Sequence, residues 1–268
     1  MIDRSIEQML LVAGRYFQLI MLIVLILVVY VGFEMAARKG RVKVRLLPQV
    51  SAIKEMVERC AEMNRPITFV PGGSSVAGTT GASIGSAHLA SLSIIAEVAY
   101  QCGLTGAKVL VLAASPVLIP LYNNVLQAGF IRSGHPEGFE PNAVRFSTPE
   151  LYSYAAWVAG EVRRENAGAN MIVGSHNMDA MIHGIAGLEV GAMQLAGPSF
   201  AYFFVAVADY VFIGPDLYVA SAYLTEDPIL LGSIRGMDLT TFVILGMAFI
   251  GLILATARSD LLLKLFGW

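Results

Sequence analysis

The chain has 268 residues, of which 56% are hydrophobic and 14% are charged, and its mean hydropathy is +0.66. This composition is too apolar for an ordinary soluble domain and too polar for a chain that lies wholly in lipid, so it favours membrane spans joined to a water-facing domain. The formal net charge of -2 leaves no excess of cations to neutralise a phosphate backbone, which argues against nucleic acid as a partner.

The first expected membrane span runs from residue 17 to residue 33 and contains no charged side chain. A helix of that length nearly matches the hydrocarbon core of a bilayer, which is about 30 Å thick. Five basic residues crowd the chain after it: Arg38, Lys39, Arg41, Lys43 and Arg45. Because basic residues stay on the cytoplasmic side, we expect residues 1–16 to form an external interfacial segment. A cleaved signal peptide is the alternative, but its basic residues would precede the apolar run.

The second expected span runs from residue 240 to residue 257 and is again uncharged. Residues 258–268 follow it and carry Phe266 and Trp268, side chains that favour the lipid headgroup level. We therefore expect an interfacial tail here. The two spans would place both termini outside the cytoplasmic (inner) membrane and the chain between them inside.

Residues 190–208 form a third uncharged stretch, which could be taken for another span. Gly197 and Pro198 interrupt it, so short strand and helix segments of a water-facing domain are favoured instead. The expected organisation is thus a basic segment with a helix over residues 34–66 and a cytoplasmic α/β domain over residues 67–238.

Within the central domain, short apolar segments alternate with helix-length segments. Expected strands, rich in Val and Ile, begin at Ile67, Lys108, Ala143, Asn170, Met193 and Asp209. Expected helices cover a segment ending before Pro66 and residues 87–101, 115–127, 148–165 (capped by Ser147 or Thr148), 178–188, 199–208 and 216–224. Strands that are apolar throughout belong to parallel sheets covered on both faces. The prediction is an α/β fold with a doubly wound, mostly parallel sheet, flanked by an N-terminal and a C-terminal transmembrane helix.

A glycine-rich segment from residue 71 to residue 88 follows the first expected strand. Its glycines free backbone N–H groups to face an anion and its hydroxyls add donors, so it is a candidate phosphate or nucleotide site. It matches neither a Walker A loop nor a G-x-G-x-x-G fingerprint, and a flexible or assembly-contact loop is the alternative. Asp209 near the last strand is a further ligand candidate. The loop candidates are Gly72, Gly73, Ser74, Ser75, Gly78, Thr79 and Thr80.

A second candidate site is formed by His176, Asp179 and His183, which are spaced i, i+3 and i+7 after an expected strand. This spacing places three ligand-type side chains on one helix face, where a divalent metal could bind them. A polar helix face or a subunit contact is the alternative. The two cysteines, Cys60 and Cys102, form no C-x-x-C pair, so we expect buried, reduced thiols.

Several segments together resemble the DUF6754 family of bacterial and archaeal membrane proteins. The segments that carry the resemblance are RKGRVKVR, AIKEMVERCAEMNRPITFVPG, PEGFEPNAVRFSTPELYSYAAWVAGEVRRENAGANMIVG and ADYVFIGPDLYVASAYLTEDPILLGSIRGMD. The resemblance covers most of the chain from the first span onward. It implies an architecture and supplies no catalytic residues.

The sequence therefore identifies no catalytic residue and no cofactor. The leading hypothesis is a homo-oligomeric membrane scaffold, a ring or lattice, whose partners are further copies of itself and the lipid bilayer, because copies held in one plane meet at high effective concentration. The second hypothesis is a membrane-tethered sensor of a nucleotide or small anion. An oligomeric channel or transporter component is the third, since two spans without an intramembrane charge form a pathway only when many copies surround it.

Overall fold

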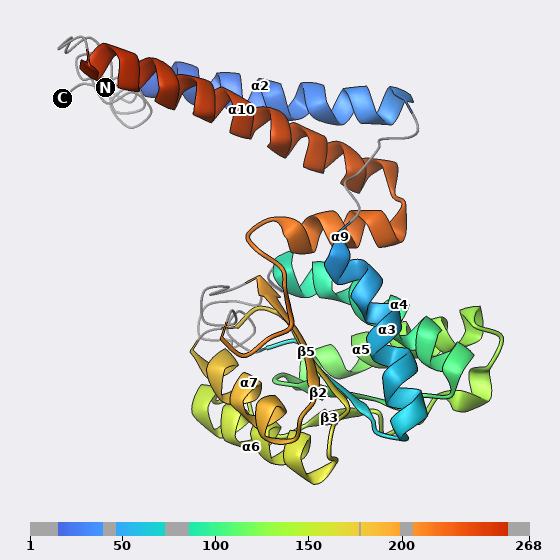
Figure 1. Cartoon of the computed structure of the whole chain (residues 1–268). Helices are drawn as coiled ribbons and strands as arrows, with labels where there is room; N and C mark the ends of the chain where they lie inside the picture. The colour runs from blue at the N-terminus through green and yellow to red at the C-terminus, as the bar shows by residue number, and fades with distance from the viewer. Residues whose placement is uncertain (1–15, 40–46, 73–85, 177, 199–205, 257–268) are drawn as a thin grey trace, which may run out of the picture. The chain divides into compact units, whose positions relative to one another are not determined.

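The computed structural model describes residues 16–39, 47–72, 86–176, 178–198 and 206–256 (Figure 1). The chain divides into two compact units. Residues 45–225 form an α/β unit, and residues 1–44 together with residues 226–268 form a unit that contains two long helices.

The α/β unit alternates strands and helices along the chain. Its elements are α3 (Pro48–Met63), β1 (Ile67–Val70), α4 (Ser86–Thr105), β2 (Val109–Ala113), the 3-10 turn η1 (Pro116–Leu118), α5 (Ile119–Arg132), the 3-10 turn η2 (Pro136–Gly138), β3 (Val144–Phe146), α6 (Leu151–Arg164), β4 (Ala169–Gly174), α7 (Asp179–Glu189), β5 (Met193–Pro198), β6 (Tyr210–Val211) and α9 (Asp216–Thr225). All six expected strands are present. The helix expected over residues 199–208 lies mostly outside the described residues.

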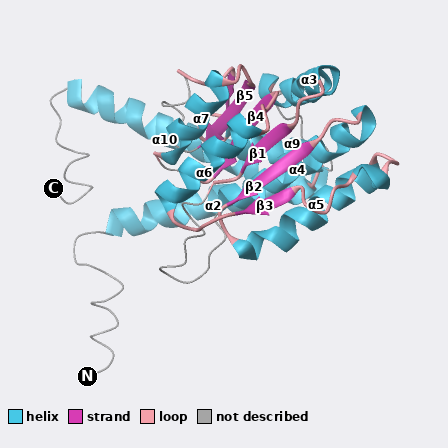
Figure 2. Ribbon diagram, turned by 90° about the horizontal axis from the view of Figure 1, so that it is seen from below, coloured by secondary structure: helices cyan, strands magenta, loops and turns pink. Residues whose placement is uncertain are grey.

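The six strands form one sheet in the order β3-β2-β1-β4-β5-β6, and every neighbouring pair is parallel. Figure 2 shows the strands side by side with helices on both faces. Successive strands are added outward from β1 on one side and from β4 on the other, so the strand order reverses between β1 and β4. The α/β prediction is confirmed, and the topology is doubly wound.

Each face of the sheet is covered by its own group of helices. Phe69 and Met171 point into the core that the sheet forms with α3, α4, α5 and α9. Leu112 points to the opposite face and packs with Tyr154 and Val158 of α6. Since both faces of the sheet are buried, its strands are apolar at nearly every position, as the sequence pattern indicates.

The first helix of this unit ends where the sequence predicts. α3 stops at Met63, and Asn64 adopts a left-handed conformation with φ of 52° that terminates the helix before Pro66. Asparagine tolerates this conformation better than most residues. The proline then starts the extended chain that leads into β1.

The cap of α6 is expected at Ser147 or Thr148, but the N-cap residue is Glu150; Thr148 Oγ1 accepts the Glu150 N–H at 3.2 Å just before the helix. The helix begins at Leu151, and the Glu150 carboxylate accepts the backbone N–H groups of Tyr152 at 3.3 Å and Ser153 at 2.7 Å. Pro149 disfavours helical backbone at the residue before it, which excludes Thr148 from the helix. The hydrogen bonds from Ser153 and Tyr152 lower the pKa of Glu150, so the cap is an ionised carboxylate at neutral pH.

Three buried polar side chains lie in register on adjacent strands and form what we call the polar ladder. Thr68 on β1 is aligned with Asn170 on β4, which is aligned with Gln194 on β5. Thr68 Oγ1 donates to Asn170 Oδ1 at 3.0 Å, and Asn170 Nδ2 donates to Gln194 Oε1 at 3.1 Å. Buried polar groups require such partners, and the three side chains supply them to one another.

The polar ladder also attaches α7 to the sheet. Asn170 Nδ2 donates to the carbonyl oxygen of His183 at 3.1 Å, and Gln194 Nε2 donates to that of Gly184 at 2.9 Å. A Cβ atom on Gly187 would lie 2.4 Å from Gln194 Oε1, so α7 approaches this closely only because residue 187 has no side chain. The ladder therefore fixes α7 relative to β4 and β5.

The second unit contains α2 (Tyr16–Lys39) and α10 (Pro228–Thr256), which pack against each other. A Cβ atom on Gly32 would lie 2.4 Å from Gly236 Cα, so the two backbones meet at this pair of glycines. Small residues at a crossing are typical of helices that associate in membranes.

One helix among the described residues is long and apolar enough to cross a membrane, and it is the Pro228–Ile253 part of α10. α10 begins before the span expected at residue 240 because Asp227 Oδ1 accepts the Ile229 N–H at 2.8 Å and caps the helix. The apolar part of α2, Leu19–Glu34, is shorter, so the N-terminal span stays a prediction.

The polar ladder leads to a stability prediction. Gln194→Leu leaves the Gly184 carbonyl and the Asn170 amide without their buried partner, and we expect the free energy of unfolding to fall by about 2–4 kcal/mol. The measurement is chemical denaturation of the full chain in detergent, followed by tryptophan fluorescence. The control is Gln101→Leu, which removes only a 2.8 Å contact with Glu97 one turn away on α4. That variant should change stability by less than about 0.5 kcal/mol, and equal stability of the two variants would contradict the role of the ladder.

Candidate functional site

The chain segments that leave β1 and β4 touch each other at the carboxyl edge of the sheet. The Ser175 N–H donates to the Pro71 carbonyl at 3.1 Å. Gly72 has a φ of 78°, and a Cβ atom on it would lie 2.1 Å from Ser175 O. Gly174 has a φ of 148°, and a Cβ atom there would lie 2.2 Å from Pro71 O. Both positions require glycine for conformation and for space.

Two buried imidazoles bind the backbone that follows β1. His88, in the first turn of α4, contacts the Gly72 carbonyl through Nε2 at 3.1 Å, and His176 contacts the Val70 carbonyl through Nε2 at 3.0 Å. A carbonyl oxygen can only accept, so each Nε2 carries the hydrogen and Nδ1 of the neutral ring holds the lone pair. Burial, reinforced by His176, lowers the pKa of His88 despite the opposing hydrogen bond to Gly72.

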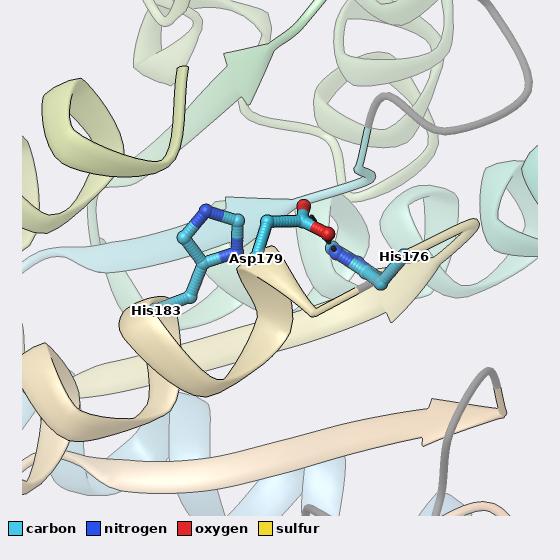
Figure 3. A group of neighbouring side chains, drawn as sticks. All are labelled: His176, Asp179 and His183. Atoms are coloured by element: carbon cyan, nitrogen blue, oxygen red, sulfur yellow. Dashed lines mark ion pairs between the residues drawn. The ribbon is translucent and has the colours of Figure 1, made fainter. Parts of the chain in front are cut away.

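His176, Asp179 and His183 lie together at the junction of β4 and α7 (Figure 3). One ligand-type atom from each residue lies within 4.8 Å of the others, and all three side chains are buried. His176 Nδ1 lies 3.7 Å from Asp179 Oδ2. The structure thus brings together the three residues that the sequence pattern selects, and two imidazoles with a carboxylate are ligand types used for divalent transition metals.

His183 lies in an aromatic environment. Its ring packs edge to face against His176, with ring centroids 5.8 Å apart, and against Tyr154 of α6, with centroids 5.6 Å apart. Neither ring nitrogen of His183 has a hydrogen-bond partner among the described residues. Burial of the ring, and to a smaller extent repulsion from His176, lower the pKa of His183 to about 3. Attraction by Asp179 opposes this shift. At neutral pH the ring is therefore uncharged, which is the form in which imidazole binds a metal.

Tyr154 forms a fixed wall beside this cluster. Its hydroxyl donates to the Leu112 carbonyl at 2.7 Å, and burial raises the pKa of the phenol well above its usual value. The ring thus contributes an apolar surface and a neutral hydroxyl that is already engaged with the backbone of β2.

The remaining predicted site residues fall into two groups. Gly72 lies in the segment after β1, where it contacts the segment after β4. The other loop candidates lie outside the described residues: Gly73, Ser74, Ser75, Gly78, Thr79 and Thr80. Asp209 precedes β6, so it lies at the amino edge of the parallel sheet. There its carboxylate accepts the Gln194 N–H at 2.7 Å. The structure does not bring Asp209 to the carboxyl edge.

Sequence reasoning misses His88, Tyr154 and the polar ladder. A signal for the ladder is present, because one polar residue recurs in each of three otherwise apolar strands, β1, β4 and β5. Two of the four histidines also lie next to strand ends or helix starts: His176 follows β4, and His88 is in the first turn of α4. Tyr154 has no such signal, since its place beside His183 depends on how α6 and α7 pack.

The comparisons with known proteins agree with the segments quoted above. The family model described as "Domain of unknown function (DUF6754)" matches residues 7–266, a range that includes the whole α/β unit and both long helices. No curated protein and no solved structure matches the chain. The chain belongs to the DUF6754 family.

Proposed function

We propose that this protein is a membrane-tethered domain that binds a small anionic ligand, such as a nucleotide or a phosphate ester, at the carboxyl edge of its sheet. The observation that carries the proposal is the reversal of strand order between β1 and β4, since the glycine-rich segment leaves the sheet at that point. In doubly wound sheets, ligands bind in the crevice at such a reversal.

The chemistry of the segment between β1 and α4 favours an anion. Residues 71–88 carry no Asp, Glu, Lys or Arg and combine five glycines with several hydroxyls. The first turn of α4 has no acidic residue, so the partial positive charge at its N-terminus is not neutralised locally. Without a Walker lysine, the ligand would be held by backbone N–H groups and hydroxyls.

A ligand screen tests this proposal. The full chain in mild detergent and phosphate-free buffer is melted with ATP, GTP, NAD and inorganic phosphate in turn. A ligand at 100 times its Kd raises the free energy of unfolding by about 2.7 kcal/mol and so raises Tm. Failure of every compound to raise Tm would remove the proposal.

A variant localises the effect to the segment. Replacing Ser74, Ser75, Thr79 and Thr80 with alanine removes the hydroxyl donors and should weaken binding, measured by calorimetry, by at least about tenfold. Ser51→Ala, on the exposed face of α3, is the control and should bind as the parent chain does. Equal affinity in both variants would place the ligand elsewhere.

We also propose that α2 and α10 both cross the cytoplasmic membrane, with the α/β unit inside and both termini outside. α2 has 24 residues and is uncharged from Tyr16 to Phe33, a stretch whose length at about 1.5 Å per residue approaches the thickness of a hydrocarbon core. The basic residues between 38 and 45 favour a cytoplasmic position for the chain that follows α2.

Labelling of an introduced cysteine tests this topology. Cys60 and Cys102 are both free and buried, and burial raises the pKa of Cys60 to about 12, so neither is a useful reporter. Lys54→Cys places a thiol on the exposed face of α3. A membrane-impermeant maleimide should label it only after the cells are permeabilised, and the parent chain should stay unlabelled throughout. Labelling in intact cells would contradict the orientation.

A second candidate function, a homo-oligomeric scaffold, is favoured by the outer face of α7. Four apolar side chains there are exposed in the described part of the chain: Met178, Ile182, Ile185 and Leu188. They recur at i, i+4, i+7 and i+10 and form a continuous apolar row, which we call the α7 stripe. Exposed apolar surface of this kind marks contact sites, and copies tethered in one membrane plane meet at high effective concentration.

The mass of the particle in mild detergent tests the scaffold. We expect an oligomer for the parent chain, and monomers for the double variant Ile182→Lys/Ile185→Lys, because two buried charges would disfavour the interface. Leu104→Lys, at an exposed apolar position near the end of α4, is the control and should keep the parent mass. Mass photometry that finds a monomeric parent chain would rule the scaffold out.

A further inference from the structure

We infer that His176, Asp179 and His183 bind a single divalent transition-metal ion of the zinc type inside the α/β unit. This inference goes beyond the proposed anion site, which rests on the glycine-rich segment between β1 and α4. The metal inference depends instead on side chains of α7 and of the segment between β4 and α7.

The donor set selects the class of ion. Two imidazole nitrogens and one carboxylate suit zinc and neighbouring first-row metals, whereas magnesium and calcium prefer oxygen ligands throughout. Zinc sites are commonly four-coordinate, so three protein ligands leave one position for a further ligand.

The backbone around the cluster orients His176 as a metal ligand. Its Nε2–H donates to the Val70 carbonyl at 3.0 Å, which directs Nδ1 toward Asp179, 3.7 Å from Oδ2. A hydrogen bond from the second ring nitrogen to a backbone carbonyl is the usual support for a metal-bound histidine, because it fixes both the tautomer and the ring orientation.

The environment of His183 gives evidence for a bound ligand that is independent of the residue types in the cluster. The side chain is fully buried, and neither nitrogen has a hydrogen-bond partner in the part of the chain that is described. Buried polar atoms are normally satisfied, so an imidazole enclosed by His176, Asp179 and Tyr154 without a partner calls for an occupant. A metal ion bound by one nitrogen of His183 meets that need.

The cluster is close to a coordinating geometry. Ligands at 2.0–2.2 Å from a tetrahedral ion lie about 3.3–3.6 Å apart, and the three ligand atoms here all lie within 4.8 Å of one another. Side-chain rotations that draw these atoms together by about 1 Å complete the site. The polar ladder anchors the main chain of α7 at the carbonyls of His183 and Gly184.

Metal titration of the full chain in detergent tests the inference. The protein is stripped with a chelator and titrated calorimetrically with ZnCl₂, and we expect one Zn²⁺ per chain. His176→Ala and His183→Ala should each lower the affinity by at least about 100-fold, more than the loss of a supporting partner costs. The control is His135→Ala, since the His135 side chain is exposed and forms a 3.1 Å contact with the exposed Glu137 carboxylate. Its affinity should equal that of the parent chain.

A second measurement separates loss of binding from loss of folding. His183→Asn keeps a polar side chain of similar size, and its near-ultraviolet circular dichroism shows whether the domain is folded. Zn²⁺ should raise the Tm of the parent chain and leave that of a folded His183→Asn chain unchanged. A folded parent chain that binds no Zn²⁺, or histidine variants that bind it as tightly as the parent, would overturn the inference. The affinity of the same variants for ATP and for phosphate is measured as well, so that failure of the metal inference can be distinguished from failure of the anion proposal.

Discussion

The hydrogen-bonded row of Thr68, Asn170 and Gln194 crosses three adjacent strands in a region that is otherwise apolar. Burying these side chains is costly unless each donor and acceptor has a partner, and the remaining amide N–H groups donate to carbonyl groups of α7 and to the Val207 carbonyl. The position of α7 on the sheet is therefore set by hydrogen-bond geometry as well as by packing. Because α7 carries Asp179 and His183, the ladder also sets the position of the candidate metal ligands.

The carboxyl edge of the sheet gathers the remaining features. Gly72 and Gly174 let the two junctions touch, and His88 and His176 bind the backbone at the end of β1. The chain leaves β1 toward the glycine-rich segment at this edge, and the histidine cluster lies at the same edge, where β4 ends.

Local patterns predict the parts of this structure that depend on local chemistry. The six strands follow from their apolar runs, and the grouping of His176, Asp179 and His183 follows from helical spacing within eight residues. Asp209 lies at the amino edge because it precedes a parallel strand, and the N-cap of α6 is Glu150 because Pro149 disfavours helical backbone at Thr148. Contacts such as that between Tyr154 and His183 depend on packing between separate helices, which no short pattern encodes.

The claim that the β4–α7 junction is a metal site is tested most directly by anomalous scattering from crystals of the full chain grown with ZnCl₂. Data collected on both sides of the zinc absorption edge locate the ion without reference to any assumed ligand. The account predicts one strong peak within about 2.0–2.2 Å of a nitrogen of His176, a nitrogen of His183 and an oxygen of Asp179. A map with no peak among these three side chains would contradict it.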